Sequence, residues 1–279
     1  MSEILLGCDL HYQVITPTTF LFNVSAAQTG RQTVFREQLL LNPAVETQFF
    51  QVGLTQNCVQ RLSLQPCDFH LHYEASVNLI AENDPTIELD EKAYSDLPPE
   101  VLPYLNPSRF CESDLLGNFA MSEFGWLPHG YSRVNAICDW TFKYIRYTSN
   151  STDAQTTARD VLVQRQGVCR DFAHLAIALC RSLSIPARYV SGYAVNLQPP
   201  DFHGFFEAYL GERWYLFDAS RLAPVGGLVR IAAGLDAADV PFATLMGSAL
   251  LKAKTVWANS IGGESIARPA QGNESVSTA

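Results

Sequence analysis

The chain has 279 residues, enough for two modest domains or one large one. Hydrophobic residues make up 47% of it and charged residues 17%, as in a globular protein with a sizeable core. A formal net charge of −9 argues against nucleic acids and anionic membranes as partners, and the sequence has no run of 18 or more apolar residues that could span a bilayer.

Residues 1–82 are predicted to form a β-rich N-terminal domain. The segment DFHLHYEASVNLI alternates, with Phe69, Leu71 and Tyr73 on one face, and TTFLFNVSA and TVFREQLLL are further strand candidates. An antiparallel sheet or sandwich is therefore expected. The start, MSEILLGCDLHY, lacks a basic region and a continuous apolar core, so we do not expect it to be a signal peptide.

Metal ions and cofactors have little support in the sequence. His70 and His72 share one strand face, but no third ligand is evident, and a solvated strand face is the favoured interpretation. The chain has no CxxC pair for structural zinc and no EF-hand loop for calcium. We therefore expect neither a metal nor a cofactor.

Residues 83–115 are predicted to be a linker that runs over the surface, because prolines interrupt any regular pattern there. A catalytic domain is expected over 116–258, beginning with helices at 133–146 and 158–166. Thr157 and Asp160 form a capping box for the second of these helices, and Gly167 is expected to end it. The Gly-, Ser- and Ala-rich residues 259–279 are predicted to be a disordered tail.

A further helix is predicted over residues 169–183, with Cys169 in its first turn. The unpaired N–H groups and the dipole of a helix N-terminus favour an anion such as a thiolate. Arg170 would add positive charge if its side chain pointed that way, and Asp171 is expected to cap the helix. His174 is a rival base by residue type, but it lies about 140° further round the helix and should point elsewhere.

A β-hairpin is predicted around Gly211-Glu212, because a two-residue turn that begins with glycine suits type II′. Its register pairs Phe205 with Asp218. His203 then shares a face with Asp218 as a diagonal neighbour, with Cα atoms roughly 7–8 Å apart. The opposite face is apolar and holds Phe206, Ala208, Tyr215 and Phe217.

Cys169, His203 and Asp218 together supply the nucleophile, the base and the base-orienting carboxylate of covalent acyl transfer. Each has an ordinary structural interpretation on its own, as a core thiol, a strand histidine or a turn aspartate. Their order and their places on the predicted elements favour catalysis. A second oxyanion donor is expected beside the Cys169 backbone N–H, with Tyr147 and Gln166 as candidates.

The segments GVCRDFAHL, RSLSIPARYVSGY, HGFFEAYL and ERWYLFDAS resemble the transglutaminase-like family of the papain-type thiol superfamily. The resemblance is strong over about residues 140–220, and the first 80 or so residues resemble the β-rich region that often precedes this domain in bacterial proteins. It implies an α+β fold, in which a Cys helix packs on an antiparallel sheet. It also implies that Cys169, His203 and Asp218 fill the family's catalytic positions.

Two positions depart from the family pattern. Phe205 stands where members often have tryptophan, and Asp218-Ala219-Ser220 replaces a frequent Asp-Pro-Thr. Both departures leave the triad intact. An aspartate as the third member, where papain-like peptidases use asparagine, supports the transglutaminase-like branch.

The expected function is that of a thiol-dependent hydrolase, a cysteine peptidase or amidase that acts on a peptide or protein substrate through a thioacyl-enzyme. A protein-glutamine acyltransferase (transglutaminase) and a catalytically silent binding module are the alternatives. Seven cysteines without a CxxC pair suit a reducing compartment, so a cytoplasmic location is expected. The sequence leaves the substrate, the acceptor and the oligomeric state open.

Overall fold

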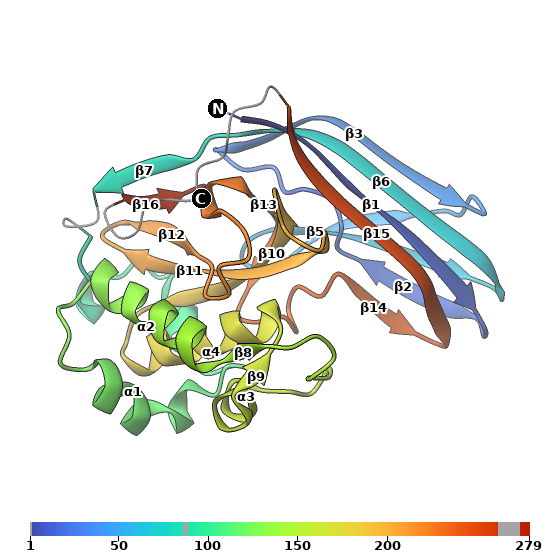
Figure 1. The fold of residues 1–279 in the computed structure, drawn as a ribbon. Coiled ribbons are helices and arrows are strands. Elements are labelled where there is room, and N and C mark those ends of the chain that lie inside the picture. Colours follow the sequence, from blue (N-terminus) through green and yellow to red (C-terminus); the bar gives the residue numbers. More distant parts are fainter. Residues whose placement is uncertain (1, 86–88, 262–273) are drawn as a thin grey trace.

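The structure, a computed structural model, describes residues 2–85, 89–261 and 274–279. It has two parts that lie side by side: a sandwich of two antiparallel sheets, and an α+β part with helices on one face of a third sheet (Figure 1). The α+β class and the β-rich N-terminal part predicted from the sequence are confirmed.

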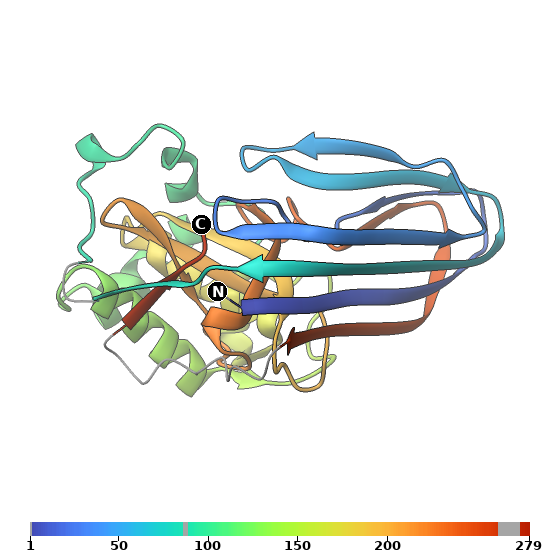
Figure 2. The same ribbon diagram turned by 90° about the horizontal axis from the view of Figure 1, so that it is seen from above.

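The sandwich is built from eight strands: Ser2–Val14 (β1), Thr18–Phe22 (β2), Gln32–Asn42 (β3), Gln48–Val52 (β4), Asn57–Leu64 (β5), Cys67–Leu79 (β6), Ala243–Met246 (β14) and Ala249–Ile261 (β15). Its two sheets have the orders β15-β1-β6-β3 and β14-β2-β5-β4, and Figure 2 shows the long strands of the first sheet running beside one another. The predicted alternation of buried and exposed side chains along β6 is confirmed, since Phe69 and Tyr73 are fully buried and Leu71 is nearly so. Aromatic rings of β2 and β6 fill the space between the sheets.

Two of these strands come from the far end of the chain. β15 pairs along nearly the whole of β1, and β14 pairs with β2. The prediction that 116–258 form one catalytic unit is therefore wrong for residues 243–258, which complete the N-terminal sandwich. The physical reason is that β1 and β2 would otherwise present unpaired N–H and C=O groups at a sheet edge.

The disordered tail predicted over 259–279 is wrong for the residues that the structure describes there. Residues 259–261 continue β15, and Glu274–Ser277 (β16) pair with Glu82–Pro85 (β7). Val276 is buried in an apolar cluster with residues 190, 205, 216 and 233 of the α+β part. The burial of this valine explains why a segment rich in small polar residues is ordered here. Residues 262–273 lie outside the described residues.

The sheet of the α+β part has the order β12-β11-β10-β13, formed by Ala187–Ala194 (β10), His203–Leu210 (β11), Arg213–Phe217 (β12) and Leu228–Gly234 (β13). Its helices are Gly117–Phe124 (α1), Tyr131–Tyr144 (α2), Ala158–Gln164 (α3) and Cys169–Ser182 (α4). The largely buried α4 packs against β10 and β11 on one side and against the other helices on the other (Figure 1). Small residues on several faces of α4 allow this close packing.

The predicted helices are confirmed with one correction. α3 has the expected capping box of Thr157 and Asp160, but it ends at Gln164 because Arg165 adopts a left-handed φ of 58°. Gly167 therefore does not end the helix. It belongs to a two-residue strand, Gln166–Gly167 (β9), which pairs in parallel with Arg146–Tyr147 (β8).

The segment predicted as a surface linker is partly buried. After β7 it contains three short 3-10 turns: Tyr94–Asp96 (η2), Leu102–Leu105 (η3) and Ser113–Leu115 (η4). Leu97 and Val101 pack on Tyr209 of β11. The prolines do break regular structure, but the apolar residues between them still bury surface.

The histidine pair on β6 lies on an exposed strand face. His72 Nδ1 is 2.8 Å from Asp9 Oδ1, and the His70 ring stacks on that of His11. The parts of the chain that the structure describes hold no group of three His, Cys, Asp or Glu side chains able to bind a metal ion. Within the same residues, no helix is both long and apolar enough to cross a membrane.

Candidate active site

Cys169 is the first residue of α4 and follows directly on the N-cap residue Val168. Its side chain is partly exposed, whereas Cys8, Cys111, Cys138 and Cys180 are buried. Asp171 closes the helix start, since its Oδ2 accepts hydrogen bonds from the Val168 N–H at 2.9 Å and from the Thr152 hydroxyl at 2.5 Å. The predicted capping role of Asp171 is confirmed, and it fixes the turn on which the thiol sits.

Arg170 does not act as a free cation beside the thiol. Its guanidinium donates to Asp171 Oδ1 at 2.9 and 2.8 Å and to the Asp153 carbonyl at 2.7 Å. Its charge is thus neutralised by a buried carboxylate. Any cation that stabilises a Cys169 thiolate has to come from another element.

The predicted hairpin register is confirmed from Leu210–Arg213 to Phe206–Phe217. Gly211 has a φ of 57°, and Glu212 is not among the residues with positive φ, as a type II′ turn requires. The ladder stops one pair before Phe205 and Asp218. His203 therefore opens β11, and Asp218 follows the last residue of β12.

His203 and Asp218 form a buried hydrogen-bonded pair. His203 Nε2 is 2.8 Å from Asp218 Oδ2, and the two residues are 0% and 8% exposed. The other carboxylate oxygen, Oδ1, accepts from the Ser220 backbone N–H at 2.9 Å and from its hydroxyl at 2.6 Å. The aspartate is held from both sides, so it can fix the orientation of the imidazole ring.

The electrostatics of the pair favour an ion pair. Burial lowers the pKa of His203, but the Asp218 carboxylate and then the Cys169 thiol outweigh it and raise the pKa to about 10. Burial raises the pKa of Asp218, but the charge and hydrogen bond of His203 and the bonds from Ser220 lower it overall. His203 Nδ1 is buried without a hydrogen-bond partner among the described residues. This nitrogen is the one left for the sulfur of Cys169.

The raised pKa of His203 predicts a loss of stability at alkaline pH. The folded state keeps the His203 proton above pH 6.5, where the unfolded state releases it, so stability is full below about pH 6.5 and declines as pH rises toward about 10. We expect the free energy of unfolding in urea to fall by about 1–3 kcal/mol between pH 6.5 and 8.5. A His203→Gln variant should lack most of this decline, and an equal decline in both proteins would contradict the ion pair.

Gly204 allows the strand and the helix to approach each other at the site. A Cβ atom on Gly204 would lie 2.3 Å from the Tyr189 hydroxyl and 3.2 Å from Arg170 Cα, at the start of α4. Tyr189 is buried, so its side chain cannot easily move aside. This glycine therefore sets the spacing between His203 on the strand and Cys169 on the helix.

A Gly204→Ala variant is expected to lose both stability and thiol reactivity. Overpacking should lower the free energy of unfolding by about 1–3 kcal/mol, and displacement of the helix start should slow alkylation of Cys169 by up to about 100-fold. Urea unfolding and iodoacetamide kinetics measure the two effects. Gly117→Ala is the matched control, since a Cβ there meets no atom within 4 Å. A Gly204→Ala protein that behaved like the control would refute the positioning role.

Tyr147 is the oxyanion-donor candidate that the structure brings to Cys169. Burial and the Cys169 thiol raise the pKa of Tyr147 to about 12, and a hydrogen bond with the Cys169 backbone opposes them in part. The parallel pairing of β8 with β9 places this tyrosine beside the start of α4. Gln166 instead has its side-chain oxygen 3.5 Å from Arg146, on the surface.

His174 is not part of the site. It is fully buried, stacks on Phe110 and accepts the Ala237 N–H at 3.1 Å through Nε2. Burial lowers its pKa to about 3, although Asp236 acts in the opposite direction. It is a neutral core histidine at physiological pH. Sequence reasoning missed the contacts of Ser220 with Asp218 and of Gly204 with the start of α4, and the only signal was that each residue is close in sequence to Asp218 or His203.

A cysteine that opens a helix and faces a histidine–aspartate pair on an antiparallel sheet defines the papain-type class of thiol proteins. Two family models match the chain: the transglutaminase-like superfamily over residues 120–219, and the bacterial transglutaminase N-terminal domain over residues 5–91. A Cytophaga hutchinsonii protein of known crystal structure, described as "a Putative Cysteine Protease", is 41% identical. Its structure superposes with a TM-score of 0.96 and covers 100% of this chain and 98% of its own. The chain belongs to the transglutaminase-like superfamily.

Curated relatives match over shorter stretches. An uncharacterized protein of Mycobacterium leprae is 31% identical over 115 residues, which are 38% of this chain and 41% of that protein. An uncharacterized protein of Mycobacterium tuberculosis is 50% identical over 54 residues, which are 19% of this chain and 17% of that protein. The chain thus spans less than half the length of these mycobacterial relatives.

Proposed function

We propose that this protein is a thiol-dependent hydrolase of peptide or amide bonds, with Cys169 as nucleophile, His203 as general base and acid, and Asp218 as the group that orients the imidazole. The observation that carries the proposal is the buried His203–Asp218 pair, whose free Nδ1 is left for the Cys169 sulfur. A buried ion pair with one nitrogen unsatisfied is costly to keep as a merely structural feature. The name of the similar Cytophaga hutchinsonii protein supports the same reaction class.

In the proposed mechanism His203 carries a proton at Nδ1 and holds the Cys169 thiolate as an ion pair. The sulfur attacks the carbonyl carbon of the substrate, and the carbonyl electron pair moves to oxygen. His203 then gives its proton to the leaving amine as the C–N bond breaks, which leaves a thioacyl-enzyme. Water loses a proton to His203, attacks the thioester and releases the acid, which restores the thiolate.

Two neighbouring groups are candidates to donate hydrogen bonds to the oxyanion. The backbone N–H of Cys169 lies in the first turn of α4, and the Tyr147 phenol lies next to it. Because the pKa of Tyr147 is raised to about 12, its hydroxyl keeps its proton at neutral pH and can donate a hydrogen bond. This arrangement supports a role for both groups in stabilising the tetrahedral intermediate.

Hydrolysis is favoured over transfer to an amine because the nucleophile is open to water. Cys169 is partly exposed, and Tyr147 beside it is 43% exposed. Amine transfer requires a site that keeps water from the thioacyl-enzyme. The open side of the site gives water that access.

A peptide screen read by mass spectrometry, with and without an added primary amine, tests this function. We expect the wild-type protein to give products that have gained water, in both conditions, and Cys169→Ala to give none. Products that have only gained the amine would show an acyltransferase instead. A wild-type protein that neither turns over peptides nor reacts with a thiol probe faster than a free thiol would indicate a silent binding module.

A further inference from the structure

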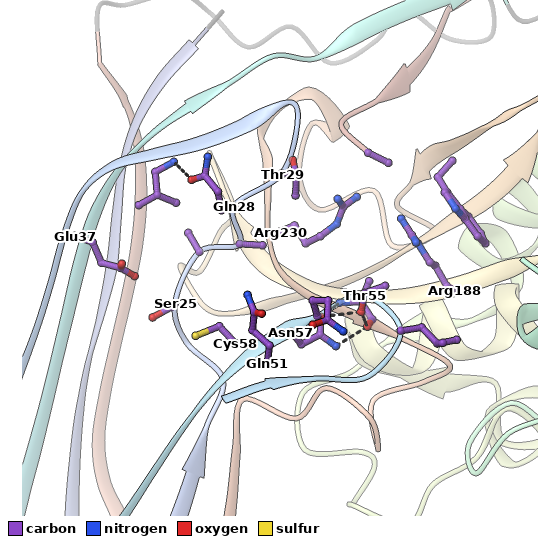
Figure 3. A pocket seen from close by; sticks show the side chains of 18 of the residues that line it. Ser25, Gln28, Thr29, Glu37, Gln51, Thr55, Asn57, Cys58, Arg188 and Arg230 are labelled. Atoms are coloured by element: carbon purple, nitrogen blue, oxygen red, sulfur yellow. Dashed lines mark hydrogen bonds between the residues drawn. The ribbon is translucent and has the colours of Figure 1, made fainter. Parts of the chain in front are cut away.

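A cavity of about 740 Å³ lies away from the proposed active site. It opens between the sandwich and the face of the catalytic sheet opposite α4, with side chains from β3, β5, β10 and β13 around it (Figure 3). None of Cys169, His203 and Asp218 lines it. Its volume is in the range of sites that bind small molecules.

Most of the charged side chains that line this cavity are basic, although the whole protein is acidic. Three guanidinium groups, those of Arg36, Arg188 and Arg230, line it together with the Glu37 carboxylate and the last residue, Ala279. The Tyr73 hydroxyl donates to the Glu37 carboxylate at 2.9 Å. This local excess of basic side chains would draw anions into the cavity.

Two of the guanidinium groups are buried and share a single carboxylate. Glu207 is 0% exposed, Arg188 donates to its Oε2 at 2.6 Å, and Arg230 donates to its Oε1. Arg188 and Arg230 are only 9% and 7% exposed. The cluster therefore holds one more buried positive charge than negative charge. An uncompensated buried charge is unfavourable unless a counter-ion is supplied.

The guanidinium groups of these two arginines are held in place, and some of their N–H groups have no hydrogen-bond partner among the described residues. The guanidinium of Arg188 stacks on the Trp214 ring, 4.2 Å from its centre. The only side-chain hydrogen bond of Arg230 within the described residues goes to Glu207, and its Nε is buried without a partner. A rigidly held, planar guanidinium group with free N–H groups is suited to bind carboxylate and phosphate oxygens.

Two neutral polar side chains of the lining are engaged with the backbone. Thr55 Oγ1 and Asn57 Nδ2 both donate to the Ala233 carbonyl, at 2.6 and 2.8 Å. They keep the wall of the cavity rigid, and the arginines supply its positively charged donors. We propose that this cavity is a binding site for a small molecule that carries a carboxylate or phosphate group, held by Arg230 and Arg188.

Isothermal titration calorimetry with inorganic phosphate and with glutarate, in chloride buffer at constant ionic strength, tests the site. We expect saturable binding of at least one probe to one site per chain, and the two probes distinguish a phosphate from a dicarboxylate ligand. An Arg230→Gln variant should bind the preferred probe about tenfold to a hundredfold more weakly, because a charge-assisted hydrogen bond is lost. This variant leaves Arg188 and Glu207 as a balanced pair, so the core keeps no unpaired charge.

Arg61→Gln is the matched control, because it removes the same charge at an exposed residue of β5 that does not line this cavity. It should bind the probe as the wild type does. Arg36→Gln, at the exposed rim of the cavity, gives a second test that does not disturb the core, and it should weaken binding. No saturable binding of either probe, or equal binding by the wild type, Arg230→Gln and Arg36→Gln, would show that the arginines only join the two parts of the protein.

Discussion

Replacement of Cys169 by alanine is expected to remove all thiol-dependent activity and rapid labelling by iodoacetamide. The loss in turnover should be at least about 10⁴-fold, because no other group in the site can form the thioacyl-enzyme. Burial raises the pKa of Cys8 and of Cys111 to about 12, so these thiols cannot substitute at neutral pH. The rate of labelling at pH 7 and the identity of the labelled peptide measure the effect.

Cys67→Ala provides the matched control for this experiment. Cys67 is also partly exposed, but it lies on β6, in the sandwich. Its replacement should leave both labelling of Cys169 and peptide turnover unchanged. If rapid labelling survived in Cys169→Ala and disappeared in Cys67→Ala, the reactive thiol would be Cys67 in the sandwich. That result would overturn the proposed mechanism.

Asp218→Asn is expected to reduce turnover by about 10³–10⁴-fold, although it changes only one oxygen to an amide nitrogen. Asp218 Oδ1 accepts two bonds from Ser220, and Oδ2 accepts from His203 and, at 3.3 Å, from the Ala223 N–H. If the amide nitrogen of the new side chain took the Oδ2 position, it would donate a hydrogen bond to His203 Nε2. The imidazole would then carry its proton on Nδ1 and could not act as a base toward Cys169.

The opposite amide orientation is no better, because the nitrogen would face the Ser220 N–H. The loss of the carboxylate charge also removes the main cause of the raised His203 pKa. The pH profile of turnover should therefore change together with the rate. Ser220→Ala is the control, because it removes one hydroxyl bond and leaves the charge in place, and its loss should stay below about tenfold. Full activity of Asp218→Asn would mean that an oriented but uncharged partner is sufficient, as in papain-like peptidases.

The local parts of the site could be predicted because each depends on near neighbours in the chain. The Gly211-Glu212 turn fixes the hairpin register, and a strand period of two then puts His203 and Asp218 on one face. The helical spacing after Cys169 likewise places the thiol at a helix start and turns His174 away from it. These inferences need no knowledge of the rest of the fold.

The contacts between these elements could not be predicted in the same way. That Gly204 permits the approach of α4, and that β8 carries Tyr147 to the Cys169 backbone, depends on packing between segments far apart in the sequence. The direction of the Arg170 side chain was also left open by the sequence, and the buried Asp171 carboxylate decides it. Long-range contacts of this kind have no local pattern that reports them.

The sequence by itself determined the family, the α+β class and the elements on which Cys169, His203 and Asp218 lie, because these are encoded in short motifs and in the periodicity of single elements. Only the tertiary structure decided that the last strands of the chain complete the N-terminal sandwich and that Arg188, Glu207 and Arg230 meet beside a cavity. Strand pairing across more than 200 residues and the partner of a buried charge are settled by which groups remain unsatisfied after folding. That requirement acts on the whole chain at once and leaves little trace in any one segment.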